Sequence, residues 1–383
     1  MKQLIISHKE VWTKEGSYFT LGGFPFQINA MSEIFSETTL ICALRKKKRR
    51  TNLTKLFGKC LTIIALPEPL GIGWKRHLAI IFWIPVHIRS IWISIKSTDI
   101  VHTMIPGDIG LIGTILTLIQ KKPLFIRHCG TWGNRTTITD RFIHWLLPKI
   151  ANGKTIVMAT GGGYDCPEPM NKSIKWIFST SITNSDWENI EVAKPWDGNE
   201  KLNLITVSRL TFDKNIQSII LSLSEIKDHF EVHLNILGDG SEMDSLLNLT
   251  QTLGLDNIIT FHGNCSHERV LKLLSKSNIF IFPTNTKEGF PKALLESMAC
   301  GLPSIAANIS VIPFLIESKC GLVLNQTLPS SVSEKIIEMT SCQDRMQKMA
   351  RMARSISKKY TLEKWKKLIS LRLEKSWGEL NEL

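Results

Sequence analysis

The stretch Lys287-Glu-Gly-Phe-Pro-Lys-Ala-Leu-Leu-Glu-Ser-Met-Ala-Cys-Gly-Leu-Pro303 predicts a strand-to-helix turn that carries two glutamates eight residues apart. The preceding run Phe280-Ile-Phe-Pro283 predicts a buried strand, and Gly289 with the proline after it turns the chain into a helix. Glu288 precedes this helix, and Glu296 lies about 12 Å further along at the helical rise per residue. The spacing suits a nucleotide sugar, with one carboxylate for sugar hydroxyls, one for the ribose diol, and helix N–H dipoles aimed at the charge between them. A surface helix with an ion pair between Lys292 and Glu296 is the competing interpretation.

The chain after residue 200 alternates strand-like and helical segments. Strands are expected at Leu202–Val207, Val232–Leu237, Ile258–Phe261, Ile279–Phe282 and Pro303–Ala306, and helices at about 216–227, 242–253, 267–276 and 291–300. This alternation implies βαβ units with a parallel sheet. Residues 331–377 are expected to be helical. The first half is less regular, with strands expected at Leu4–Ile6, Leu61–Ala65, Asp99–His102, Leu124–Arg127, Thr155–Met158 and Trp176–Phe178, and helices at about 28–44, 75–96, 109–120 and 136–149.

Four motifs in the second half resemble family 4 glycosyltransferases, which are retaining enzymes of GT-B fold. The two-glutamate stretch resembles the E-x7-E signature of that family. Val207-Ser-Arg-Leu-Thr-Phe-Asp-Lys-Asn215 resembles its first strand and phosphate-binding turn, Leu234-Asn-Ile-Leu-Gly-Asp-Gly-Ser241 its glycine-rich strand end, and Ile259-Thr-Phe-His-Gly263 the strand and glycine near the base. The motifs follow the family's order over residues 200–320, whereas the first half matches more loosely.

This resemblance implies an α/β protein of GT-B fold, in which two Rossmann-like doubly wound domains face a cleft. We expect an acceptor-side domain at residues 1–190, a nucleotide-sugar donor domain at 191–355, and a C-terminal helix at 356–383 that packs back on the first domain. The linker is expected within Asn184–Glu200, where polar residues, Pro195 and Gly198 interrupt any periodicity. The family's linker usually reads Asn-Gly-Val-Asp, and this chain has Asn184-Ser-Asp-Trp187 instead.

The resemblance also implies a set of site residues. The catalytic residues are His128, Arg209, Lys214 and Glu288, and the donor-binding residues are Gly22, Gly23, Arg209, Lys214, Gly238, Gly263, Glu288, Gly289, Phe290, Pro291 and Glu296. Arg209 and Lys214 would bind the donor diphosphate together with helix N–H groups. His128 would lie close to the anomeric carbon, although Cys129 interrupts the family's usual His-Gly pair. Lys292 replaces a common small polar residue and is expected to bear on the choice of sugar.

Each of these features can also be interpreted as an ordinary structural or surface residue without a role in the reaction. Arg209 and Lys214 can be ordinary surface cations. His128 can be a structural histidine, and His102 competes with it for the same role. Gly22 and Gly23 can form an ordinary turn.

Charge is concentrated in the first half of the chain. Residues 1–190 hold 24 Lys and Arg against 12 Asp and Glu, whereas residues 191–383 hold 23 against 22. This bias favours an anionic membrane surface or an anionic acceptor, although solvated basic residues would look the same. The run Arg45–Arg50 is the densest basic segment, and the apolar segment Leu78–Ile95, which contains Pro85, is expected to form a buried or interfacial helix. No nucleic-acid module is found.

We therefore expect a cytoplasmic glycosyltransferase, peripheral to the inner face of a membrane, that uses a nucleotide-diphosphate sugar and serves cell-surface polysaccharide or lipopolysaccharide biosynthesis. The acceptor would be a glycan or a lipid-linked sugar. No signal peptide is apparent, and eight scattered cysteines suggest reduced thiols. Because the chain has no Asp-x-Asp triplet, no metal and no other cofactor is expected. The alternatives are another GT-B enzyme, such as a sugar phosphorylase or a nucleotide-sugar hydrolase or epimerase, and a catalytically silent binding protein.

Overall fold

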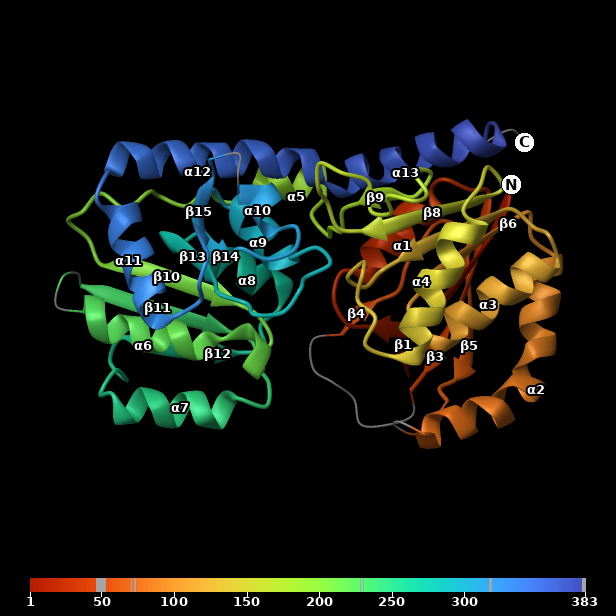
Figure 1. Ribbon diagram of the computed structural model, residues 1–383, viewed down its shortest axis with the longest axis horizontal. Coiled ribbons are helices and arrows are strands. Elements are labelled where there is room, and N and C mark those ends of the chain that lie inside the picture. The colour runs from red at the N-terminus through yellow and green to blue at the C-terminus, as the bar shows by residue number, and fades with distance from the viewer. Residues whose placement is uncertain are drawn as a thin grey trace. The chain divides into compact units, whose positions relative to one another are not determined.

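The computed structural model describes residues 1–45, 53–69, 71, 74–227, 229, 231–316 and 319–380. The chain forms two compact units, one made of Met1–Ser181 with Leu362–Leu383 and the other of Ile182–Thr361. Each unit is a mainly parallel sheet with helices on both faces (Figure 1). Apart from Arg45, the basic run that ends at Arg50 lies outside the described residues.

The sheet of the first unit has nine strands within the described residues. They are β1 (Lys2–Lys14), β2 (Ser17–Thr20), β3 (Glu37–Leu44), β4 (Thr54–Lys55), β5 (Leu61–Pro67), β6 (Ile100–Ile105), β7 (Leu124–His128), β8 (Thr155–Thr160) and β9 (Lys175–Ile177). The parallel strands run in the order β5-β3-β1-β6-β7-β8-β9, while β2 pairs antiparallel with the far half of β1 and with β4. The order reverses between β1 and β6, and doubly wound sheets bind ligands at the carboxyl ends of such a strand pair.

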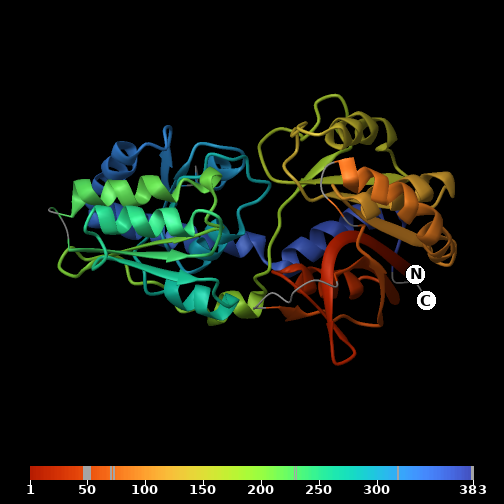
Figure 2. The ribbon, with the colours of Figure 1, turned by 90° about the horizontal axis from the view of Figure 1, so that it is seen from below.

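Helices cover both faces of this sheet (Figures 1 and 2). One core contains buried residues of α1 (Phe24–Ser32) and α13 (Leu362–Trp377), including the fully buried Trp365. The core on the opposite face contains buried residues of α2 (Trp74–Lys96), α3 (Asp108–Ile119) and α4 (Ile138–Ile150). The C-terminal helix is therefore part of the core of the first unit.

The predicted helix at 28–44 is wrong over its second half. The structure ends α1 at Ser32 and places the strand β3 at Glu37–Leu44. This strand lies between β1 and β5, and most of its side chains are buried. A central parallel strand is covered on both faces, so its sequence is apolar without alternation and resembles a buried helix.

The second unit has a sheet of six parallel strands within the described residues, in the order β12-β11-β10-β13-β14-β15. They are β10 (Leu202–Val207), β11 (Val232–Leu237), β12 (Ile259–Gly263), β13 (Ile279–Phe282), β14 (Ser304–Ala307) and β15 (Gly321–Leu324). The helical segments are α5 (Asn184–Asn189), η1 (Phe212–Lys214), α6 (Ile216–Ile226), α7 (Met243–Thr252), α8 (His267–Leu274), α9 (Lys292–Ala299), α10 (Ile312–Ile316), α11 (Pro329–Thr340), α12 (Gln343–Ser357) and η2 (Lys358–Tyr360). The predicted strands β10, β11 and β13 agree with the structure at both ends.

The chain crosses between the units at Ser181–Ile182 and Thr361–Leu362 rather than after residues 190 and 355. The segment expected to be a linker begins with helix α5. Thr183 and Asp186 form a capping box, in which each side chain accepts a hydrogen bond of 2.9 Å from the other's backbone N–H. Thr183 and Asp186 are therefore a helix start signal, whereas residues 191–201, which include Pro195 and Gly198, form neither helix nor strand.

Candidate active site

In the second unit the strand order reverses between β10 and β13, and the segments after these two strands meet. The turn η1, which follows β10, carries Lys214, and the loop after β13 carries Glu288. The Lys214 ammonium forms an ion pair with the Glu288 carboxylate, and its Nζ lies 3.4 Å from Asp213 Oδ2. Only 6% of the Lys214 side chain is exposed. Two residues predicted from separate motifs are thus brought into direct contact.

Backbone hydrogen bonds fix this contact. The Asn285 N–H donates to the Asp213 carbonyl at 2.8 Å, which ties the loop after β13 to η1. Asn215 follows Lys214 in the left-handed conformation, with φ of 54°, and its side-chain amide donates to the Thr327 carbonyl at 2.8 Å. Asparagine tolerates that conformation better than most residues. The sequence of η1 therefore sets where the lysine points.

Arg209 and Gly238 come from the ends of the neighbouring strands β10 and β11. Arg209 is exposed, and its guanidinium has no side-chain partner among the residues that the structure describes. A Cβ on Gly238 would lie 1.7 Å from the Ser208 carbonyl oxygen, and its φ is +135°. Only glycine fits there. The Gly238 N–H donates to the Gly263 carbonyl at 2.9 Å, so both predicted glycines lie on the same sheet edge.

Helix α9 begins beside this contact. Its N-cap is Pro291, and no side chain caps its first turn. The Phe290 ring is buried, and its centroid lies 5.7 Å from that of Tyr360. The Ser310 hydroxyl donates to the Glu288 carbonyl. Backbone N–H groups at such a helix start attract anions, and Gly289 leaves the approach to them without a side chain.

Glu296 lies on α9 and contacts a histidine that the sequence analysis did not identify. Glu296 Oε1 lies 3.5 Å from His267 Nδ1, and the Glu296 side chain is 11% exposed. His267 is the first residue of α8, after the N-cap Ser266. Its position a few residues beyond Gly263, the glycine expected near the base, was a signal that could have identified it.

In the first unit, His128 ends β7 and is 3% exposed. Its ring centroid lies 5.2 Å from that of Trp132 and 5.5 Å from that of His144. Burial lowers the pKa of His128 to about 4, and the neighbouring His144 makes a smaller contribution in the same direction. His128 Nδ1 lies 3.2 Å from the Gly130 carbonyl oxygen. A neutral ring that donates from Nδ1 keeps a lone pair on Nε2, so His128 can accept a hydrogen bond near pH 7.

The competing His102 lies in the core of the first unit. It is fully buried on β6 and stacks on Phe125 with a centroid distance of 4.5 Å. Burial, and then the charge of Arg127, holds the pKa of His102 well below its ordinary value. Gly22 has φ of +73°, and Gly23 is the N-cap of α1. The left-handed φ of Gly22 favours glycine in this turn, although a Cβ there would meet no atom within 4 Å.

A second polar cluster lies where the strand order of the first unit reverses, and the sequence analysis missed it. Arg76 Nε donates to Asp108 Oδ2 at 2.7 Å, and Arg76 Nη2 lies 2.7 Å from His8 Nε2. Burial, and then the charge of Arg76, lowers the pKa of His8. A Cβ on Gly107 would lie 2.7 Å from the His8 Cβ. No motif marks these residues, because they come from β1, the start of α2 and the start of α3.

Comparison with known sequences finds a family match within the second unit. The profile of the family described as Glycosyl transferases group 1 matches residues 188–356. N-acetyl-alpha-D-glucosaminyl L-malate synthase of Bacillus anthracis is 27% identical over 163 residues, which span 42% of each chain. Alpha-monoglucosyldiacylglycerol synthase of Streptococcus pneumoniae is 23% identical over 249 residues, 58% of this chain and 54% of that one. The chain thus spans about half the length of these relatives.

Comparison with solved structures extends over both units. Anabaena Alr3699/HepE, solved in complex with UDP, aligns with a TM-score of 0.71 at 16% identity, covering 98% of this chain and 100% of that one. At this identity the likeness shows the fold alone. The structural neighbours are GT-B glycosyltransferases, which confirms the fold class predicted from the sequence.

Proposed function

We propose that this chain, whose residues 188–356 match the profile of the family described as Glycosyl transferases group 1, is a retaining glycosyltransferase that uses a nucleotide-diphosphate sugar. The acceptor would be a glycan or a lipid-linked sugar in cell-surface polysaccharide or lipopolysaccharide synthesis. The single observation that carries this proposal is the buried contact between Lys214 and Glu288 at the strand pair where the order reverses. An ordinary surface ion pair joins two solvent-exposed side chains, whereas the Lys214 side chain is only 6% exposed.

The residues of this site match the charge that the reaction develops. Transfer breaks the bond between the sugar and the diphosphate, so negative charge grows on the departing nucleoside diphosphate. Lys214, Arg209 and the N–H groups at the start of α9 would stabilise that charge in place of a metal. Glu288 would hold the donor sugar's hydroxyls and Glu296 the ribose. The acceptor hydroxyl would then attack from the face that the phosphate leaves, which retains the anomeric configuration.

The first experiment identifies the donor. UDP-, GDP- and ADP-sugars are added separately, and the shift in melting temperature is measured with and without EDTA. One nucleotide series should stabilise the protein, and EDTA should not remove the effect. NMR of the product formed with a glycan acceptor should show the donor's anomeric configuration. No stabilisation by any series would contradict the proposal, and an inverted product would contradict the retaining mechanism.

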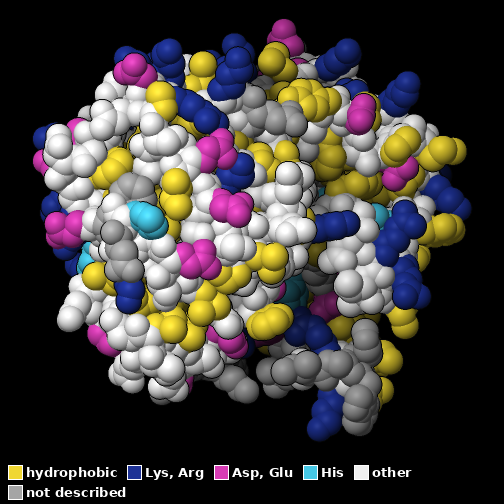
Figure 3. Space-filling model, turned by 60° about the vertical axis from the view of Figure 1, so that its left-hand side comes forward, with side chains coloured by type: hydrophobic (Ala, Val, Ile, Leu, Met, Phe, Trp, Pro, Cys, Tyr) yellow, Lys and Arg dark blue, Asp and Glu magenta, His cyan; other side chains and the backbone are white. Residues whose placement is uncertain are grey.

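We further propose that the first unit binds the cytoplasmic face of an anionic membrane. Residues Leu78–Lys96 of α2 have a mean hydropathy of 1.7, but only 17% of this window is buried, so the segment is not the buried helix that the sequence also allowed. Phe82 is 75% exposed and Val86 71% exposed. Acidic and basic side chains are mixed on the face shown in Figure 3. The excess of basic over acidic residues lies within residues 1–190 of the sequence. Exposed apolar residues beside cations favour an interfacial helix.

Vesicle flotation tests this attachment. The protein should float with vesicles that contain phosphatidylglycerol at low salt and dissociate at high salt, because screening weakens the attraction. Replacing Phe82 and Val86 by Ser should reduce the bound fraction, and the exposed Leu371→Ser is a matched control on α13. The absence of binding at low salt, or equal binding of the double variant and the control, would refute the attachment without bearing on the transferase proposal.

A further inference from the structure

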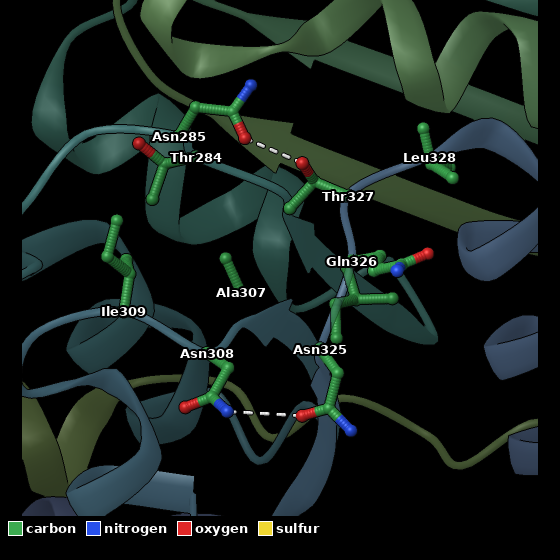
Figure 4. Close-up of a pocket in the computed structure, with 10 residues that line it drawn as sticks. Thr284, Asn285, Ala307, Asn308, Ile309, Asn325, Gln326, Thr327 and Leu328 are labelled. Carbon is green, nitrogen blue, oxygen red and sulfur yellow. Dashed lines mark hydrogen bonds between the residues drawn. The ribbon is translucent and has the colours of Figure 1, made fainter.

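The carboxyl ends of β13, β14 and β15 surround a hollow in the second unit with a volume of about 460 Å³ (Figure 4). This volume lies within the roughly 300–1,000 Å³ typical of small-molecule sites. None of the predicted donor-binding residues is among those that line it. We call this hollow the β13–β15 pocket. It lies at the edge where doubly wound sheets bind ligands.

The pocket is lined by uncharged polar groups. Asn285 follows β13, Asn308 follows β14 and Asn325 follows β15, and threonine and glutamine side chains lie between them. Among the described residues that line it, none is ionisable. An anionic ligand such as a diphosphate needs cationic partners, so the lining favours a neutral ligand. Each side-chain amide offers donors and an acceptor together, and a sugar hydroxyl can use both.

Two hydrogen bonds hold the amides in place around the pocket (Figure 4). Thr327 Oγ1 donates to Asn285 Oδ1 at 2.6 Å, and Asn308 Nδ2 donates to Asn325 Oδ1 at 3.1 Å. In the described part of the chain, Nδ2 of Asn285 and Nδ2 of Asn325 have no further side-chain partner. Donors that are already oriented lose less freedom on binding. Leu328 and Ile309 add apolar surface for the ring carbons of a sugar.

The position of the pocket along the sheet edge indicates which sugar it would bind. His267, the partner of Glu296, begins the helix that follows β12, the pair Lys214–Glu288 lies at β10 and β13, and the pocket lies beyond that pair toward β15. A donor that places its ribose at Glu296 and its sugar at Glu288 would point its sugar end toward the pocket. A side-chain hydrogen bond joins the two sites, because the hydroxyl of Ser310, which follows the lining residue Ile309, donates to the Glu288 carbonyl.

We propose that the β13–β15 pocket binds an uncharged sugar residue of the acceptor glycan. The statement that this sugar belongs to an acceptor glycan rests on the proposed function. The existence of a sugar-binding site in the pocket does not. The pocket would hold part of the acceptor on the donor-binding unit itself. It would thereby favour acceptors that carry a neutral sugar over those that carry an anionic group at the same position.

The test measures binding rather than turnover. The methyl α-glycosides of glucose, galactose, mannose and N-acetylglucosamine are titrated separately by saturation-transfer NMR, with and without UDP, GDP and ADP. At least one glycoside should bind, and the nucleotides should not displace it. The double variant Asn308→Ala with Asn325→Ala should bind it at least tenfold more weakly. Both side chains are exposed, and the similarly exposed Asn257→Ala is the matched control.

Each outcome decides the matter. The proposal is overturned if no glycoside binds, if a nucleotide displaces the glycoside, or if the double variant and Asn257→Ala bind equally well. The nucleotide titrations report separately on the proposed function. If a glycoside binds and no nucleoside diphosphate does, the pocket stands and the transferase proposal fails. If a nucleotide binds and no glycoside does, the pocket proposal fails and the transferase proposal stands.

Discussion

The two units share a sheet architecture but differ in the chemistry at the strand pair where the order reverses. At β10 and β13, one buried cation, Lys214, contacts a carboxylate from the opposite loop. At β1 and β6, Arg76 lies between His8 and Asp108, and both ends of the Arg76–Asp108 ion pair are about one quarter exposed, at 27% and 24%. Lys214 is 6% exposed and lies against both Glu288 and Asp213, so an incoming phosphate would compete with carboxylates for a buried charge. Arg76 also lies 4.0 Å from Glu68, and its partly exposed, already paired guanidinium is better suited to orienting hydroxyl groups.

The largest expected effect comes from removing the buried cation. Lys214→Met retains most of the packing but loses the charge, so turnover should fall by about 10²–10³-fold. Glu288→Ala should reduce turnover by a comparable factor. Transfer rates and melting temperatures are measured together, and the exposed Lys201→Met serves as the control. Near-normal turnover in folded Lys214→Met would refute the role assigned to the second unit.

His128 should contribute a titration of its own to the pH dependence of stability. Its pKa of about 4 lies below the ordinary 6.5, so the unfolded chain binds more protons between these values. The free energy of unfolding therefore falls as the pH drops from about 6.5 to 4, by up to about 3 kcal/mol. His128→Gln should flatten that part of the curve in urea unfolding experiments. Parallel curves for the two proteins would show that His128 is not neutral in the folded state.

The contrast between the units also explains which features the sequence could predict. In the second unit, Lys214 and Glu288 each belong to a short continuous motif, and an apolar strand precedes each motif. Parallel strands bring such motifs to one edge, so the contact could be anticipated. His8, Arg76 and Asp108 come from three distant segments without a motif, and only the fold brings them together. The strand β3 was mistaken for helix because its neighbours bury both of its faces.

His267 tests how far the donor site extends toward β12. If it helps to hold the Glu296 carboxylate against the ribose diol, His267→Ala should weaken binding of the donor's nucleoside diphosphate about tenfold, or roughly 1.4 kcal/mol. The variant should also lose part of the preference for this nucleotide over its 2′-deoxy analogue, with little change in kcat. Calorimetry with both nucleotides measures this, and His229→Ala is a control on an exposed histidine of the same unit. An unchanged preference would limit His267 to a structural role.

The smallest effect is expected for Asp108→Asn in the first unit. This variant most directly distinguishes the role of the Arg76 cluster from that of the Lys214 cluster. Asp108→Asn removes the charge from the bond to Arg76, which costs at most about 1 kcal/mol of stability at a partly exposed pair. If this cluster orients the acceptor, KM for the acceptor should rise severalfold while affinity for the donor's nucleoside diphosphate stays the same. Asp213→Asn, beside Lys214, should change the affinity for that nucleotide and leave KM for the acceptor unchanged. The same pattern in both variants would show that the clusters do not divide donor and acceptor between them, because each would then act on both substrates.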